Sequence, residues 1–487
     1  MKLSILSLSP EYKYRYIDHH VIEDSGLSRI LDDRTWSFLK AICPTEEILA
    51  RQKLFHALME PLFKERFCVF HDTLNTFLRS DKLLTEAETV CEGLFLFTKH
   101  YRCFQKLIET IKAFPLTDSI FIERLSAYAE LKQNEFREYE SLFSEYQNLL
   151  DAISHSKIHV SSGSSHILKA KSTEHPSSVI DEIKDCKRAF GYSEDISIPQ
   201  TIRMSLPISE TLQLLYPNEF SRLLELKGVL HDVLDNDVFT LKEEADFYLS
   251  VLNLVERATE HEIPYSFATV SKRKQYIAKD IYDISLLAKR IPNGQYVSNH
   301  VFFTENEHCF FLLGANGGGK TTYLRAVASN LILFLSGCPI FCESAEIYPF
   351  EMVFTHFPAD EHFDHGGRLF DEECRVRAML DKGTENSFIF LNETFTGADA
   401  RKGLLLSLSF MRNFAEKNAF CLFVTHFYEV MEFEFPVLCA AVNTDQENQR
   451  TFKIERGVRE KRSYAEDILK KYRLDRNSLA ERRKIND

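Results

Sequence analysis

The sequence predicts an α+β multidomain protein in which a mostly helical N-terminal region precedes an α/β domain. Two patterns indicate this arrangement. In the first third of the chain, apolar residues recur at steps of three and four, the spacing of one face of a helix. Towards the C-terminus, short apolar runs alternate with helical segments, as in a buried and mostly parallel sheet. At roughly 150 residues per domain, a chain of 487 residues has room for about three domains.

We assign residues 1–150 to a helical core. One apolar stripe runs from Val90 to Ile111, and a second runs from Phe136 to Leu150. Each stripe covers at most about three heptads, so packing inside a helical bundle is expected rather than an extended coiled coil.

Residues 151–288 are expected to form a linker with short strands, followed by returning lever helices. Ser, His and Lys dominate residues 154–178, which is typical of an exposed linker. A short polar–apolar run at 196–206 predicts one or two strands. Helical periodicity then returns at 218–234 and 241–258.

Composition excludes some classes of protein. The formal net charge of -13 argues against a generally basic surface but leaves room for a local basic groove. Eleven cysteines without a C-x-x-C pair predict reduced thiols in a cytoplasmic protein. No run approaches the ~18 uncharged apolar residues of a membrane span, so no membrane association is expected.

Residues 289–487 are assigned to the α/β domain, which ends in a charged helical tail. Within it, "GANGGGKT" from Gly314 to Thr321 fits the pattern G-x-x-x-x-G-K-[ST] and lies between an apolar strand and a helical run. Such glycines let backbone N–H groups turn toward phosphates at a helix N-terminus. Lys320 is expected to reach the β- and γ-phosphates of ATP, and Thr321 to ligate Mg²⁺. The residues expected to bind the nucleotide are Gly314, Ala315, Asn316, Gly317, Gly318, Gly319, Lys320, Thr321 and Thr322.

A second apolar run, "SFIFLNE", delivers Asn392 and Glu393 to the end of a predicted strand, where ligands bind in such sheets. Glu393 is the candidate base that orients and polarises the attacking water. Asn392 stands where an Asp would usually hold Mg²⁺; its amide oxygen can accept from a metal-bound water but carries no charge. The alternative is a simple turn at the end of a strand.

A third strand, "CLFVTH", ends at Thr425 and His426. His426 is a candidate sensor of the γ-phosphate that helps to hold the water. A single histidine at a strand end is more often structural. Two phosphate elements precede it in the expected order, which favours the functional interpretation.

These motifs together resemble the MutS family of DNA mismatch-repair ATPases. "GANGGGKTTYLR" is similar to that family's G-P-N-M-G-G-K-S-T-Y-x-R, and "VTHFYEV" is similar to "ATHYFEL". "FTHFPADEHFDHGGRLFDEE" and "GVREKRSYAEDILKKYRL" resemble two later family segments. Asn299 matches the Asn of the strand that borders the nucleotide, and Ile48, Arg51 and Gln52 match an I-x-x-R-Q helix near the start of the family's core. The resemblance implies a P-loop ATPase domain of the ABC type.

The chain also departs from that pattern. The family reads mismatches with a Phe-x-Glu wedge in an N-terminal domain. Here the triplets at 63–65, 136–138 and 303–305 lie in predicted helices or just before the P-loop, so we expect no mismatch-reading domain. Arg368 aligns with the Ser that the family contributes to the partner's ATP. It could act in trans as an arginine finger or be a solvated loop residue.

The resemblance therefore implies a reduced MutS-like ATPase that dimerises through its ATPase domains, with ATP between protomers, and acts on DNA. A branched or recombination structure is one candidate substrate. The alternative is a slow or non-hydrolysing, nucleotide-gated protein-interaction module, which the acidic composition favours. A basic stripe on the helical arms would favour DNA. An ABC transporter subunit is disfavoured, because no L-S-G-G-Q segment precedes the second motif.

Overall fold

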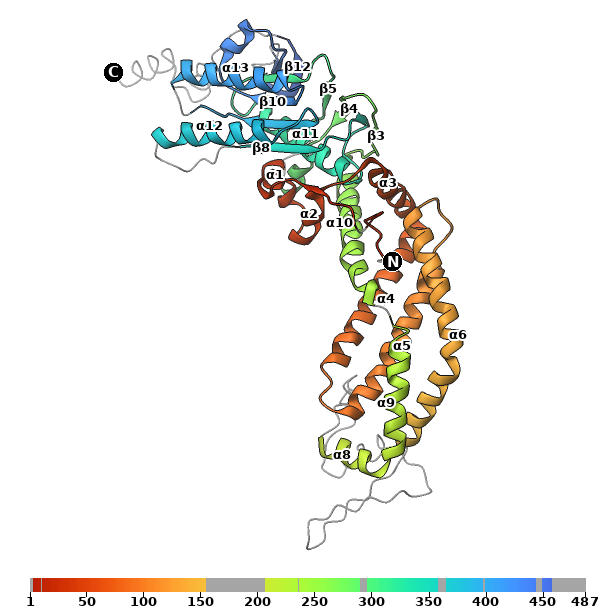
Figure 1. The fold of residues 1–487 in the computed structure, drawn as a ribbon. Helices are drawn as coiled ribbons and strands as arrows, with labels where there is room; N and C mark the ends of the chain where they lie inside the picture. The colour runs from red at the N-terminus through yellow and green to blue at the C-terminus, as the bar shows by residue number, and fades with distance from the viewer. Residues whose placement is uncertain are drawn as a thin grey trace, which may run out of the picture. The chain divides into compact units, whose positions relative to one another are not determined.

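The chain folds as two compact units, each made of two separate segments (Figure 1). The helical unit comprises Met1–Pro10 and His56–Asp246, and the sheet unit comprises Glu11–Phe55 and Phe247–Asp487. The computed structural model describes residues 3–9, 11–154, 206–234, 236–289, 296–357, 365–396, 399–443 and 449–457. This mixture of helical and sheet regions confirms the predicted α+β class. Residues 155–205 and 458–487 lie outside the described residues. These ranges include most of the predicted linker, the strands predicted at 196–206 and most of the predicted C-terminal tail.

Long amphipathic helices form the helical unit, as the apolar stripes predict. They are α4 (Pro61–Thr85), α5 (Val90–Lys112), α6 (Ile120–Ser154), α8 (Leu206–Leu215) and α9 (Pro217–His231), followed by the short η2 (Asn236–Phe239). The Thr89 side chain caps α5 by accepting from the amide of Glu92. Inside the bundle, the ring of Tyr101 on α5 stacks on Phe143 of α6 with centroids 4.2 Å apart. The boundary between the units falls within α3 (Thr45–Met59) and within α10 (Thr240–Glu260). No helix among the described residues is long and apolar enough to cross a membrane.

A six-stranded sheet forms the centre of the sheet unit, in the order β12-β11-β6-β10-β9-β8. Its strands are β6 (Cys309–Leu313), β8 (Met352–His356), β9 (Ser387–Asn392), β10 (Phe420–Val424), β11 (Val437–Asn443) and β12 (Gln449–Arg456). All neighbours pair in parallel except β11 and β12. Val424 lies opposite Asn392 on one side and opposite Leu312 on the other. The carboxyl ends of β6, β9 and β10 therefore meet at one edge of the sheet.

Helices and a second sheet cover the two faces of this sheet. On one face, α12 (His365–Lys382) and α13 (Ala400–Glu416) bury an apolar cluster that includes Phe311 and Phe423. Side chains alternate along a strand, so Phe310 points the other way and meets Phe303 at 4.8 Å. Phe303 belongs to the four-stranded sheet, in the order β3-β7-β4-β5. The strands of this second sheet are β3 (Thr269–Val270), β4 (Tyr276–Ile281), β5 (Asn299–Phe303) and β7 (Ser344–Ile347). Two short helical turns complete the sheet unit: η3 (Ile284–Ala288) follows β4, and η5 (Tyr428–Glu432) follows β10.

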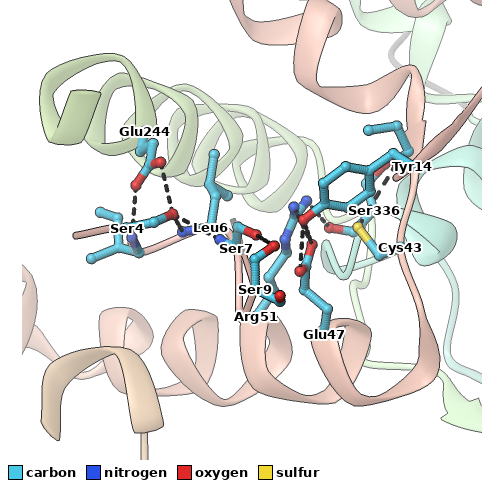
Figure 2. A network of polar contacts seen from close by, with 12 residues as sticks. Ser4, Leu6, Ser7, Ser9, Tyr14, Cys43, Glu47, Arg51, Glu244 and Ser336 are labelled. Carbon is cyan, nitrogen blue, oxygen red and sulfur yellow. Dashed lines mark hydrogen bonds and ion pairs between the residues drawn. The ribbon is translucent and has the colours of Figure 1, made fainter. Parts of the chain in front are cut away.

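The N-terminal segment of the sheet unit packs around α11 (Lys320–Leu335). Its elements are β1 (Arg15–Tyr16), α1 (His19–Ser25), η1 (Leu27–Arg29), α2 (Asp33–Leu39), β2 (Ala41–Ile42) and the first part of α3. Figure 2 shows how this segment holds the end of α11: the Arg51 guanidinium donates to the Ser336 carbonyl at 3.1 Å and to the Glu47 carboxylate at 2.7 Å. The hydroxyl of Tyr14 donates to the same carboxylate, and the Cys43 amide donates to the Leu335 carbonyl at 3.1 Å. The carbonyls at the C-terminus of α11 therefore have partners from a remote part of the sequence.

Candidate nucleotide-binding site and a basic groove

The glycine-rich loop at 314–319 connects β6 to α11 at the carboxyl edge of the six-stranded sheet. Gly314 and Gly319 have φ angles of 141° and 94°, which favour glycine. A Cβ atom at Gly314 would also lie 2.7 Å from the Ala440 methyl group on β11. The glycines thus serve both the turn and the close approach of a neighbouring strand. Because α11 begins directly after the loop, its N-terminal amides face this edge, as phosphate binding requires.

Lys320 is the first residue of α11, and its side chain is 3% exposed. Its ammonium donates to the carbonyls of Gly314 at 2.9 Å and Ala315 at 3.2 Å. The Glu393 carboxylate lies 3.9 Å away. Burial lowers the pKa of Lys320, and the charge of Glu393 opposes that change. The contacts of Nζ with these two carbonyls place the Lys320 side chain inside the loop, where a phosphate would meet it.

Glu393 follows β9 directly and is fixed by contacts from the neighbouring strand. Its amide donates to the Val424 carbonyl at 2.9 Å, and its carboxylate meets Nε2 of His426 at 2.8 Å. The hydrogen bond from His426 lowers the pKa of Glu393 against the effect of burial, and the charges of His426 and Lys320 add to this. With 36% of its side chain exposed, Glu393 is an ionised carboxylate within reach of water. The structure thus brings Lys320, Glu393 and His426 together.

Two neutral oxygens face each other beside this carboxylate. The Thr321 hydroxyl donates to Oδ1 of Asn392 at 3.2 Å. Mg²⁺ prefers oxygen ligands and keeps several waters, so a hydroxyl and an amide oxygen fit it when ATP supplies the negative charge. Among the described residues, no group of three or more His, Cys, Asp and Glu side chains could hold a metal by itself.

Asn299 stands at the start of β5 and uses both ends of its amide on the backbone of β12. Its Nδ2 donates to the Phe452 carbonyl at 3.1 Å, and its Oδ1 accepts from the Ile454 amide at 2.7 Å. A Cβ atom at Gly319 would lie 3.5 Å from that of Phe452, so this strand runs beside the glycine-rich loop. In this structure Asn299 fixes the strand that borders the loop.

The remaining predicted residues occupy the loop and the first turn of α11. Asn316 and Gly317 are exposed, whereas Thr322 is half-buried. Arg368 lies near the start of α12, and its side chain is outside the described residues. Its action on a partner's nucleotide stays a prediction.

One buried carboxylate that was not predicted as a site residue contacts the site. Glu372 on α12 is 4% exposed and accepts from the amide of Phe395 at 2.8 Å, two residues beyond Glu393. The acidic run at 371–373 gives no sign of which residue faces the sheet. The helical repeat could have indicated that Glu372 faces the sheet, because it lies four and seven residues before the buried Val376 and Met379.

The helical unit contains a basic groove between α5 and α6, which the net charge left possible but no sequence pattern located. The groove has a volume of about 500 Å³. Its charged and amide side chains are Lys99, Arg102 and Lys106 on α5, and Gln147, Asn148 and Asp151 on α6. The three cations are spaced by three and four residues, so they lie on one face of α5. Three exposed cations against one carboxylate make this groove positive in a chain of net charge -13.

Comparisons with known proteins point to one family. Residues 310–475 match the family model of MutS domain V. The DNA mismatch repair protein MutS of an Exiguobacterium species is 24% identical over 507 aligned residues, which cover 90% of this chain and 59% of that protein. The MutS protein of Halalkalibacterium halodurans is 28% identical over 215 residues, or 41% of this chain and 25% of the relative. The MutS protein of Oceanobacillus iheyensis is 26% identical over 272 residues, which cover 51% of this chain and 31% of that protein. The chain thus spans 25% to 59% of the length of these relatives.

Proposed function

Because this chain belongs to the MutS family, we propose that it binds and hydrolyses ATP in the sheet unit and couples this to DNA binding in repair or recombination. One observation carries the proposal. The glycine-rich loop, the Thr321–Asn392 pair and the Glu393–His426 pair converge at one edge of the six-stranded sheet. They come from three separate parts of the sequence, and phosphate transfer requires these groups together.

Each group has a distinct part in the proposed hydrolysis. The loop amides and Lys320 would bind the phosphates, and Thr321 and Asn392 would hold Mg²⁺. When bound, Mg²⁺ neutralises charge on the phosphates. Glu393 orients the attacking water and accepts its proton, while His426 fixes the Glu393 carboxylate and donates toward the γ-phosphate. The neutral Asn392 weakens metal binding, so we expect hydrolysis to be slow.

We also propose that the active form is a homodimer with ATP between two sheet units, as the family resemblance implies. Arg368 would then either reach the nucleotide of the partner or stay in solvent.

The basic groove supports DNA as the partner. Lys99, Arg102 and Lys106 span seven residues of helix, or about 10 Å at about 1.5 Å per residue. That span exceeds the rise of about 3.4 Å between successive phosphates of one strand, so the groove can neutralise more than one phosphate. Contacts of this kind position a nucleic acid without reading its sequence.

The alternative function is a slow or non-hydrolysing, nucleotide-gated protein-interaction module. The neutral Asn392 and the acidic composition favour it. In that case ATP would still bind at the glycine-rich loop, but the helical unit would bind a protein rather than DNA.

Binding and hydrolysis of ATP by the full chain test the proposal, with Lys320→Ala as the matched blank. We expect the wild type to bind a fluorescent ATP analogue with Mg²⁺ and to release phosphate, and Lys320→Ala to do neither, because the buried ammonium is lost. Equal turnover by the two proteins would show that the activity does not arise at this site.

A further inference from the structure

The turn after β9 holds its backbone in an unfavourable conformation. Glu393 has a φ angle of 51° and Phe395 has one of 69°, although neither is glycine. Residues with a side chain rarely adopt this left-handed region, and they remain there only where surrounding contacts hold them. Glu393 is the proposed base, so whatever holds this turn also sets the direction of its carboxylate.

At least four contacts hold the turn. The Glu393 amide donates to β10, and the hydroxyl of Thr396 donates to the Glu393 carbonyl at 2.9 Å. The buried ring of Phe395 stacks on Phe410 of α13 at 5.6 Å. The fourth contact is the charge-assisted hydrogen bond from the Phe395 amide to Glu372 at 2.8 Å. Of these four, only the bond to Glu372 uses a carboxylate, and Glu372 is 4% exposed.

We propose that Glu372 is a positioning residue for ATP hydrolysis, because it fixes the turn that aims the Glu393 carboxylate at His426. This inference rests on the proposed function. Without Glu372, the Phe395 amide would be left buried without its acceptor, and the turn would relax toward ordinary right-handed conformations. Glu393 would then move away from His426, although the glycine-rich loop and Lys320 would be unchanged.

The neighbouring glutamate provides a matched control. Glu373 has the same side chain one position later on α12, but it pairs with Arg377 one turn along the helix at 2.9 Å. Replacing Glu373 therefore removes the same charge from the same helix without touching the turn.

The experiment compares Glu372→Leu, Glu372→Gln and Glu373→Leu in the full chain, with kcat, KM and the affinity for a fluorescent ATP analogue measured for each. We expect Glu372→Leu to lower kcat by about tenfold or more with nucleotide affinity within about twofold, because ground-state binding is kept. Glu372→Gln keeps an acceptor oxygen and should restore much of kcat. Glu373→Leu should stay within about twofold of the wild type.

The split between kcat and nucleotide affinity distinguishes positioning from general damage. A folded Glu372→Leu variant with wild-type kcat would overturn the proposal. So would a parallel loss of kcat and nucleotide affinity.

Hydrogen exchange provides a readout that does not depend on turnover. In Glu372→Leu, amides in the peptide that covers residues 387–396 should exchange faster, while Glu373→Leu should exchange as the wild type does. Unchanged protection would contradict the role of Glu372 even in a protein that hydrolyses no ATP. Absence of hydrolysis that depends on Lys320 would instead refute the proposed function.

Discussion

The nucleotide site of the sheet unit and the basic groove of the helical unit hold their charges in opposite ways. In the nucleotide site, Lys320 is buried, and Glu393 and His426 are in contact at 2.8 Å. In the groove, the cations of α5 are exposed to solvent. Buried and paired charges act at fixed positions and resist salt, whereas exposed charges attract a polyanion at a distance and are screened by salt. Geometry should therefore control the first site, and ionic strength the second.

The largest effect that this comparison predicts is at Glu393. Replacing its carboxylate by an amide in Glu393→Gln keeps the shape of the side chain but removes the base. We expect kcat to fall by about 10²-fold or more, with nucleotide binding retained, so that ATP stays trapped in the site. Single-turnover hydrolysis together with filter binding of radiolabelled ATP measures both properties. Normal turnover by Glu393→Gln would show that another group is the base.

In the groove, charge reversal at Lys99 and Arg102 should weaken DNA binding and reduce its dependence on salt. Each lost phosphate contact lowers the slope of log K against log salt by about 0.9 for duplex DNA. Fluorescence anisotropy of labelled duplexes at several salt concentrations measures the slope. Lys82→Glu on α4 is the control, because it reverses an exposed charge that pairs with Glu86 outside the groove. If Lys82→Glu weakened DNA binding and lowered the salt slope by the same amount, the effect would come from the general charge of the protein rather than from the groove.

At the metal position, Asn392→Asp should strengthen Mg²⁺ binding. The Asn392 amide oxygen already faces Thr321, so a carboxylate at this place adds negative charge beside the expected metal. We expect the Mg²⁺ concentration for half-maximal hydrolysis to fall several-fold, as measured by titrating the metal at fixed ATP. An unchanged requirement would place the metal away from Asn392.

The smallest predicted effect is on pH dependence. The hydrogen bond and charge of His426 lower the pKa of Glu393, so Glu393 stays ionised below its ordinary range. Hydrolysis that depends on the carboxylate should therefore be lost only as the pH falls through this lowered value. In His426→Ala the acid limb should move upward, toward the ordinary value of 4.5. If the acid limb of His426→Ala moved to lower pH instead, His426 would not be the group that lowers the pKa of Glu393.

Local patterns predicted the elements whose residues are close in sequence. The stripe from Val90 to Ile111 is helix α5, because amphipathic periodicity is a local property. The glycine-rich loop, Asn392-Glu393 and His426 were predicted separately, and the parallel sheet brings them together because each follows a buried strand. Their functional roles stay predictions.

The rest depends on contacts that no local pattern encodes. Arg51 was recognised by resemblance, but its bond to Ser336 joins residues 285 positions apart. The position of Glu372 against Phe395 depends on how α12 packs on the sheet. The groove depends on the pairing of α5 with α6, which places Lys99 and Arg102 beside Gln147.

The most direct test of the central proposal, that ATP hydrolysis is coupled to DNA, is steady-state hydrolysis by the purified full chain, with and without duplex and branched DNA. Lys320→Ala provides the blank. The account predicts hydrolysis above that blank, at a rate that changes when DNA is added and changes less as salt is raised. Hydrolysis that is indifferent to both kinds of DNA, or tight ATP binding without any turnover, would contradict the coupling and favour the nucleotide-gated protein-interaction module.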